Sequence, residues 1–163
     1  MTEDLNELAR ELGELLSRRN LRLSVAESCT GGWVAKVVTD IAGSSAWFDR
    51  GFVTYSNQAK VDMLAVREET LEEHGAVSEA TASEMVRGAL ENSLADVAVA
   101  VSGIAGPGGE VPGKPVGMVC FSWQTRDGVE RVRTEYFQGD RASVRRQAVA
   151  RALEGVLSVI ESA

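Results

Sequence analysis

Val97-Ala98-Val99-Ala100-Val101-Ser102 is an almost uninterrupted apolar run that leads directly into a glycine-rich segment. A strand that is buried on both faces of a sheet reads as a continuous apolar run, because helices cover it on either side. The run therefore predicts the central strand of an α/β protein.

Helical and strand patterns follow one another on both sides of this run. Leucines at helical spacing predict an opening helix, and an Asp-Gly pair predicts a hairpin turn between the last two strands. Asn57 is expected to cap the third helix. The expected helices cover residues 4–19, 33–39, 57–65, 68–73, 78–92 and a last stretch after Gly139-Asp140, and the other strands cover 21–26, 46–55, 116–124 and 129–137. Because the hairpin requires an antiparallel pair, we expect one domain over residues 1–163, a three-layer α/β/α sandwich around a mixed, mostly parallel sheet.

Composition and charge narrow the function classes. The chain has 163 residues, enough for one domain with a single core, and a formal net charge of −7. An acidic protein lacks the positive face that a phosphate backbone requires, so nucleic acid is not expected as a partner. No apolar run approaches the roughly 20 residues of a membrane span and the first residues are acidic, so we expect a cytoplasmic protein without membrane contact. With two distant cysteines and one histidine, no metal site is expected.

Ser28 is the candidate nucleophile, because it lies where a predicted strand passes into a helix. It precedes Thr30, Gly31 and Gly32, and the free backbone N–H groups at a helix start favour an anion. The two glycines also let the backbone approach a substrate closely. A serine that only caps the helix, beside glycines that only turn the chain, is an alternative explanation of the same spacing.

A serine hydroxyl needs a base to remove its proton, and the chain offers a single histidine, His74. His74 lies among helix-end residues and is expected at the surface, so lysine is the better candidate. Lys60 falls in the first turn of the helix predicted after Asn57, where the helix dipole and any burial disfavour the ammonium form. A neutral amine there would accept the Ser28 proton, and a solvated lysine is the alternative. Cys29 is intrinsically a better nucleophile than serine, but a small buried thiol is the more frequent case.

Residues 102–117 carry six glycines and three prolines, which predicts an irregular loop that is long enough to be functional. A loop after a buried strand is the usual ligand-binding position in an open α/β sheet. The expected ligand contacts in this loop are Gly103, Ala105 and Gly106. Residues 108–114 also match G-x-x-x-x-G-K, but Pro115 follows where a nucleoside triphosphatase needs a hydroxyl, so we reject a P-loop.

Arg141 and Arg145 stand four residues apart on one face of the last predicted helix, close to its start. A pair of guanidinium groups beside free backbone donors makes a good phosphate clamp. A solvated helix face whose arginines pair with carboxylates is the alternative.

Four motifs, taken in order, carry a resemblance to a known family. They are Ala26-Glu27-Ser28-Cys29-Thr30-Gly31-Gly32, Gly51-Phe52-Val53-Thr54-Tyr55-Ser56-Asn57 with Lys60, Ser102-Gly103-Ile104-Ala105-Gly106-Pro107-Gly108, and Phe137-Gln138-Gly139-Asp140-Arg141. Over roughly residues 5–158 the chain resembles the CinA C-terminal domain family, whose stand-alone members are nicotinamide-nucleotide amidases. The resemblance implies hydrolysis of nicotinamide mononucleotide to nicotinate mononucleotide and ammonia, in pyridine-nucleotide salvage. It also implies a homodimer with an α/β/α fold that needs no metal or other cofactor.

The resemblance further implies roles for individual residues. Family members place the nucleophile in the first motif and a tyrosine and a lysine in the second, so we expect Ser28, Tyr55 and Lys60 to act together. Tyr55 would donate a hydrogen bond or relay a proton. Glu27 would face the pyridinium ring or the ribose hydroxyls, with an ordinary salt bridge as the alternative. The expected substrate-binding set is Glu27, Thr30, Gly31, Gly32, Gly103, Ala105, Gly106, Arg141 and Arg145.

Two functions of other classes remain open at this point. A non-catalytic nucleotide-binding module would use the same glycine-rich loop and Arg141, with Ser28 only touching the ligand. A competence- or damage-associated interaction domain is suggested by the family name alone. Longer family members carry a pyrophosphatase-like domain before this one, and we expect that second activity to be absent here.

Overall fold

The computed structural model describes residues 4–162 of the chain. In chain order its elements are α1 (Leu5–Arg19), β1 (Leu23–Glu27), α2 (Trp33–Thr39), the 3-10 turn η1 (Ser44–Ala46), β2 (Phe48–Val53), α3 (Asn57–Leu64), α4 (Glu68–His74), α5 (Glu79–Glu91), β3 (Val97–Gly103), β4 (Met118–Thr125), β5 (Glu130–Tyr136) and α6 (Arg141–Glu161). Each element lies close to its predicted place. The predicted strand over 46–55 is shorter at both ends, because η1 precedes it and an irregular segment leads from it into α3.

The sheet has the strand order β2-β1-β3-β4-β5. β1 pairs in parallel with both β2 and β3, whereas β4 is antiparallel to both β3 and β5. The sheet is therefore mixed, as expected, but its pairings are evenly divided rather than mostly parallel. The reason is that the glycine-rich segment after β3 returns the chain as a hairpin, while helical crossovers connect β1, β2 and β3.

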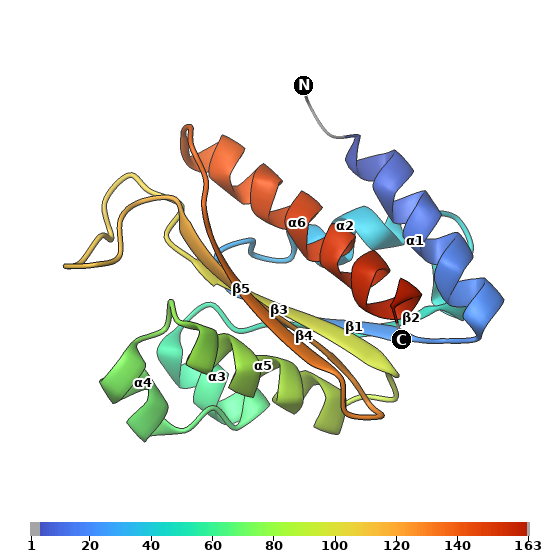
Figure 1. Ribbon diagram of the computed structural model, residues 1–163, viewed down its shortest axis with the longest axis horizontal. Helices are drawn as coiled ribbons and strands as arrows, with labels where there is room; N and C mark the ends of the chain where they lie inside the picture. Colours follow the sequence, from blue (N-terminus) through green and yellow to red (C-terminus); the bar gives the residue numbers. More distant parts are fainter. Residues whose placement is uncertain (1–3, 163) are drawn as a thin grey trace.

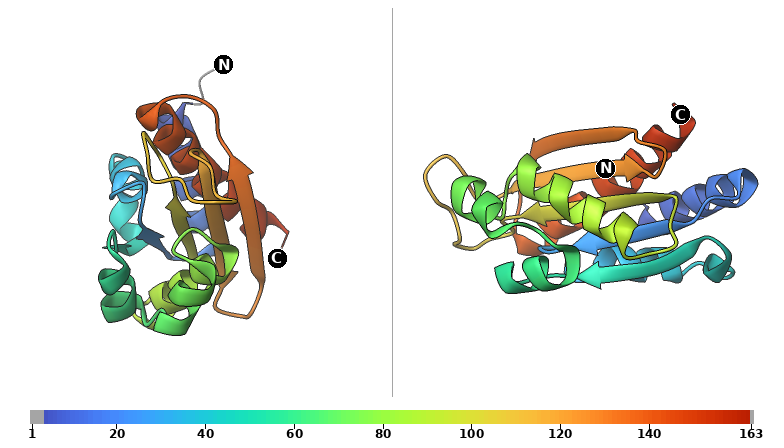
Figure 2. Two further views of the ribbon diagram at one scale, coloured as in Figure 1. Left: turned by 90° about the vertical axis from the view of Figure 1, so that its left-hand side faces the viewer. Right: turned by 90° about the horizontal axis from the view of Figure 1, so that it is seen from below.

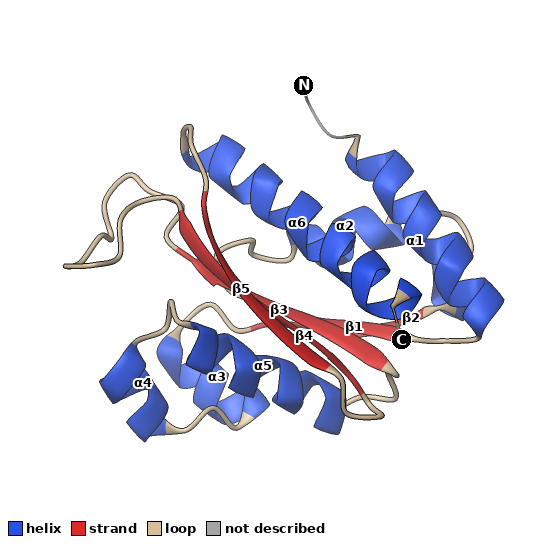
Figure 3. Ribbon diagram, in the orientation of Figure 1, coloured by secondary structure: helices blue, strands red, loops and turns tan. Residues whose placement is uncertain are grey.

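Helices cover both faces of the sheet and confirm the three-layer sandwich. α1, α2 and α6 lie on one face and α3, α4 and α5 on the other (Figures 1 and 3). Figure 2 shows the sheet between these two layers from two further directions. The valines of β3 point into the core under α1, α2 and α6, and its alanines point into the core under α3 and α5. This double burial explains why the β3 sequence is apolar without interruption.

Short polar side chains define where the helices begin. Asp4, Ser78 and Asp140 cap α1, α5 and α6 by accepting backbone N–H groups of the first turn. The expected cap at Asn57 is wrong by one residue, because Ser56 Oγ accepts from Ala59 N at 3.0 Å. Asn57 is instead the first helical residue of α3. Within residues 4–162, no helix has the length and apolar character needed to cross a membrane.

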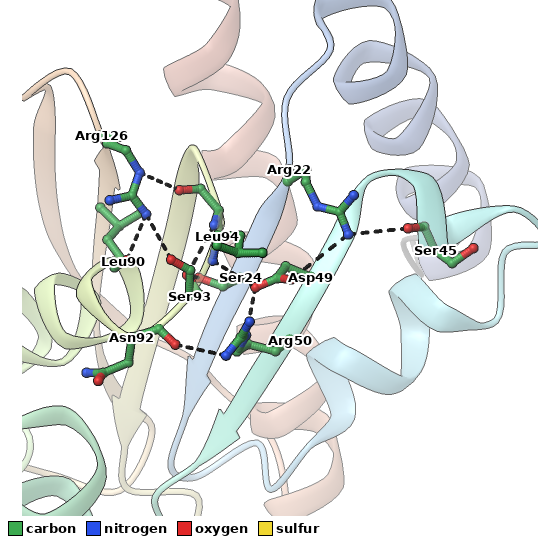
Figure 4. Close-up of polar contacts among 11 residues, drawn as sticks. Arg22, Ser24, Ser45, Asp49, Arg50, Leu90, Asn92, Ser93, Leu94 and Arg126 are labelled. Carbon is green, nitrogen blue, oxygen red and sulfur yellow. Dashed lines mark hydrogen bonds and ion pairs between the residues drawn. The ribbon is translucent and has the colours of Figure 1, made fainter.

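A polar cluster joins the strands at the end of the sheet where β1 and β3 begin (Figure 4). Asp49 accepts hydrogen bonds from Arg50 Nε at 2.7 Å and from Leu94 N at 3.0 Å. Burial opposes ionisation of Asp49, but these hydrogen bonds and the charges of Arg50 and Arg22 outweigh it and lower the pKa of the carboxyl group. The cluster ties β2 to the segment that leads into β3.

The opposite end of the sheet gathers the segments that matter for function. β1, β2 and β3 run in parallel, so residues that follow them meet at one edge. Ser28 follows β1, Thr54 and Tyr55 follow β2, and the glycine-rich loop follows β3. α6 begins at this same end, where the loop projects from the sheet (Figure 1).

Candidate active site

The side chains of Ser28 and Lys60 meet at the carboxyl end of β1. Lys60 Nζ lies 3.0 Å from Ser28 Oγ, and it also contacts the main-chain oxygens of Thr54 at 2.9 Å and Tyr55 at 3.2 Å. With Lys60 Nζ donating to Ser28 Oγ, the serine hydroxyl in turn lies 3.5 Å from Tyr55 O. When Lys60 is neutral, its two N–H bonds serve the two carbonyls and its lone pair is left to face the serine hydroxyl. The contacts therefore suit an amine that accepts the Ser28 proton.

Burial favours the neutral form of Lys60. Only 1% of the Lys60 residue is exposed, and Ser28 is 8% exposed. Because the ammonium form loses its hydration, burial lowers the pKa of Lys60 from its ordinary value. Within the described chain, no carboxylate forms an ion pair with Lys60 that would oppose this effect.

The other two nucleophile or base candidates are placed differently. Burial raises the pKa of the Cys29 thiol to about 12, so this thiol stays protonated and unreactive near neutral pH. The His74 side chain is exposed at the end of α4, beside Glu73. A Ser-His pair is therefore absent from residues 4–162, whose only histidine is His74.

Tyr55 reaches the site through its main chain. Its carbonyl oxygen accepts from Lys60 Nζ, while the residue is 62% exposed and its hydroxyl lies 3.5 Å from Arg141 Nη2. No hydrogen bond joins that hydroxyl to Ser28 or Lys60 in the described part of the chain. The expected proton relay from the phenol to Ser28 is therefore not seen in this geometry.

Glu27 lies beneath the site instead of facing a substrate. It is fully buried, and its carboxylate accepts from Gly32 N at 3.2 Å, Val34 N at 2.9 Å and Ala35 N at 3.0 Å. The Thr30 hydroxyl adds a fourth hydrogen bond at 2.6 Å. The first N–H groups of α2 are thus already occupied, so Glu27 binds the helix start where a substrate contact was expected.

Arg141 and Arg145, the two arginines of α6 that were expected to bind phosphate, make different contacts. Arg145 donates from Nε to Cys29 O at 3.0 Å and from Nη2 to Thr30 O at 3.1 Å, so it binds protein carbonyls where a phosphate contact was expected. Arg141 is exposed and donates from Nη1 to Gly106 O at 2.8 Å. Only Arg141 borders the space in front of Ser28.

That space is a cavity of about 240 Å³. Its lining includes six residues of the expected catalytic and binding sets and the rejected nucleophile Cys29; the six are Ser28, Tyr55, Lys60, Gly103, Ala105 and Arg141. Gly106 is not part of the lining, but its carbonyl oxygen accepts from Arg141 Nη1. Thr30, Gly31 and Gly32, which were expected to touch a substrate, are absent from the lining and form the turn that leads into α2.

Four further lining residues were not anticipated: Asn57, Ala76, Val77 and Ser102. Ser102 ends the run of buried β3 residues, and a polar residue at that position was a usable signal. Asn57 was interpreted as a helix cap, so its place beside the cavity was missed. Ala76 and Val77 lie between Gly75 and the cap Ser78, a pattern that indicates only a turn before α5, and the fold brings them near Ser28. Among residues 4–162, no cluster of three or more histidine, cysteine, aspartate or glutamate side chains could hold a metal ion.

A buried serine whose hydroxyl contacts a lysine of lowered pKa can attack the carbonyl carbon of an amide or an ester once the lysine is neutral. The family comparison agrees with such chemistry. The nicotinamide-nucleotide amidohydrolase PncC of Escherichia coli (strain K12) is 58% identical over 151 residues, which are 93% of this chain and 92% of that protein. The PncC of Pseudomonas putida is 48% identical and covers 96% of this chain and 98% of its own length.

The fold comparison gives the same grouping. The crystal structure of the competence/damage inducible protein CihA from Agrobacterium tumefaciens superposes with a TM-score of 0.93 at 46% identity, over 98% of both chains. The model of the CinA C-terminal domain matches residues 5–160. The chain therefore belongs to the CinA C-terminal domain family.

Proposed function

We propose that this protein hydrolyses the carboxamide of nicotinamide mononucleotide to nicotinate mononucleotide and ammonia, in pyridine-nucleotide salvage. The single observation that carries the proposal is the 3.0 Å contact between Ser28 Oγ and the buried Lys60 Nζ. The names of the PncC relatives identify the substrate class. The chemistry follows from the residues of this chain.

In the first step, neutral Lys60 takes the proton of Ser28 while Oγ attacks the carboxamide carbon. The carbonyl oxygen becomes negative, and the Cys29 N–H directly after the nucleophile is a suitable donor for it. Within residues 4–162 this N–H donates to no main-chain carbonyl, and its neighbour is the Cys29 thiol. The C–N bond then breaks, and the nitrogen leaves as ammonia with the proton that Lys60 returns.

In the second step, Lys60 takes a proton from water, and the hydroxide attacks the Ser28 ester. The ester bond breaks, Ser28 Oγ regains its proton from Lys60, and nicotinate mononucleotide leaves. General-base assistance of this kind contributes roughly 10²–10⁴-fold to a rate. No step requires a metal or a redox cofactor.

Substrate binding is assigned to the exposed side of the cavity. The Arg141 guanidinium carries a permanent charge that suits the phosphate, and Gly103 and Ala105 leave room for the ribose-phosphate at the loop. Tyr55 places its exposed hydroxyl beside Arg141, so we assign its side chain to contact with the bound nucleotide. We also propose a homodimer, on the family resemblance, and a cytoplasmic location, where pyridine nucleotides are recycled.

The test is incubation of the purified protein with nicotinamide mononucleotide, with ammonia and nicotinate mononucleotide measured separately. Both products should appear in equal amounts, and Ser28→Ala should abolish them while the far-ultraviolet circular dichroism stays unchanged. Saturable binding of the nucleotide without ammonia would identify a binding module instead. Neither binding nor ammonia release would favour an interaction domain.

A further inference from the structure

The turn that carries Ser28 is held by two charged side chains that do not line the cavity. Glu27 accepts the N–H groups of Gly32, Val34 and Ala35, and Arg145 donates to the carbonyls of Cys29 and Thr30. One side chain therefore satisfies main-chain donors of this segment and the other satisfies main-chain acceptors. Both residues bind the protein main chain next to the nucleophile.

We propose that Glu27 and Arg145 are positioning residues, which hold Ser28 Oγ in register with Lys60 Nζ without touching the substrate. This inference rests on the proposed function in one respect, that Ser28 is the nucleophile. It assigns to both residues a role different from the substrate contact that their sequence neighbourhood favours.

The geometry of Arg145 explains why an arginine is needed. Its Nε and Nη2 atoms reach two successive carbonyls at 3.0 and 3.1 Å, which uses the planar shape of the guanidinium. The guanidinium carbon also lies 5.5 Å from the centre of the Trp33 ring, which restricts its movement. A Cβ on Gly31 would stand 3.3 Å from Nη2, so the turn packs closely against Arg145. A lysine ammonium could serve only part of this arrangement.

The remaining main-chain bonds of the turn hold Ser28 itself. Ser28 N donates to Val101 O at 3.0 Å and Ser28 O accepts from Gly31 N at 3.0 Å. These bonds fix the start of the turn, whereas Glu27 and Arg145 fix the part that continues into α2. A displacement of about 1 Å at a reacting group can lower a rate by about 10²-fold.

The experiment compares Arg145→Ala, Arg145→Lys and the nearly isosteric Glu27→Gln with Arg151→Ala as the matched control. Arg151 lies on the same helix and pairs with Glu135 on β5, away from the cavity. Two readouts are used: kcat and KM for ammonia release from nicotinamide mononucleotide, and the rate at which a fluorophosphonate probe labels Ser28. The labelling reports on the nucleophile without needing the nucleotide.

We expect Arg145→Ala and Glu27→Gln to lower both kcat and the labelling rate by about 10²-fold, with KM unchanged. Arg145→Lys should recover part of the loss, added guanidinium should partly rescue Arg145→Ala, and Arg151→Ala should resemble the wild type. If Arg145→Ala does not fold, Arg145→Lys and Glu27→Gln decide the matter. A raised KM with unchanged kcat and labelling would show a ligand contact and overturn the inference.

Failure of the proposed function gives a different pattern. If the fluorophosphonate probe labels Ser28 of the wild type but no ammonia is released, the substrate assignment is wrong. The labelling rates of the variants then test the positioning roles by themselves. Folded Arg145→Lys and Glu27→Gln variants that label at the wild-type rate refute the positioning roles. A wild-type protein that is not labelled at Ser28 overturns both.

Discussion

Replacement of Lys60 by methionine removes the base while it keeps a long side chain in the buried position. A lysine in water has a pKa of about 10.4, so about one amine in 2,500 is neutral at pH 7. Burial lowers the pKa of Lys60, and each unit of lowering raises the neutral fraction about tenfold. We therefore expect kcat/KM of the wild type to rise about tenfold per pH unit below the Lys60 pKa, and to level off below the pH at which an ordinary lysine titrates.

Lys60→Met should lower kcat by about 10²–10⁴-fold and remove this rise with pH. The assay is quantification of nicotinate mononucleotide by chromatography in stopped reactions, because coupled ammonia assays change with pH themselves. Lys36→Met is the matched control, since Lys36 is exposed on α2 and pairs with Asp40. A wild-type inflection at the ordinary lysine value, or near-normal turnover in Lys60→Met, would refute the role of Lys60 as the base.

The lowered pKa of Lys60 also affects stability. Between the lowered pKa and about 10.4, the unfolded chain binds a proton at this lysine that the folded chain does not bind. The free energy of unfolding should therefore rise with pH across that window, and Lys60→Met should remove this contribution. Denaturant titrations at several pH values measure it.

Four other outcomes test the remaining assignments. Cys29→Ser should leave kcat within about threefold of the wild type, because burial keeps the thiol protonated; a loss as large as that of Ser28→Ala would contradict this. Arg141→Ala should raise KM by roughly 10- to 100-fold, the value of one charged hydrogen bond, with a smaller change in kcat; the reverse pattern in steady-state kinetics would place Arg141 in catalysis. Asp49→Asn should lower the free energy of unfolding at pH 7, and the difference from the wild type should vanish as pH falls through the lowered Asp49 pKa, measured by urea titration. Gly88→Ala should cost about 1–3 kcal/mol in thermal unfolding, because its Cβ would collide with the main-chain oxygen of Leu64. An unchanged melting temperature would show that α3 and α5 can separate freely.

The main elements of the fold could be read from local patterns. The apolar run of β3, the leucine spacing of α1 and the Asp-Gly turn before β5 each depend on neighbours within a few residues. The parallel or antiparallel direction of β4 could not be read in this way. It depends on whether the glycine-rich loop crosses over the sheet or turns back, and glycines and prolines allow either path.

Some residues of the candidate site could be predicted from the sequence, and the roles of others could not. Residue type and the shortage of histidine made Ser28 and Lys60 candidates, and the family resemblance selected them. The structure places them in contact. The main-chain partners of Glu27 and Arg145 could not be predicted from the sequence. Glu27 caps the following helix, and Arg145 reaches from α6 to the turn that carries Ser28. Sequence neighbours cannot distinguish a charged side chain that binds a ligand from one that binds the main chain.

The local sequence therefore determined the helices, the buried strand and the residue types available at the site. Side-chain periodicity and helix caps depend only on residues that are close together in the sequence. The three-dimensional fold alone brought Lys60 within 3.0 Å of a serine 32 positions away. The fold also buries that lysine enough to lower its pKa. It directs Arg145 to main-chain carbonyls and Arg141 to the cavity. Distance and burial decide these roles, and both arise from packing between segments that are remote in the sequence.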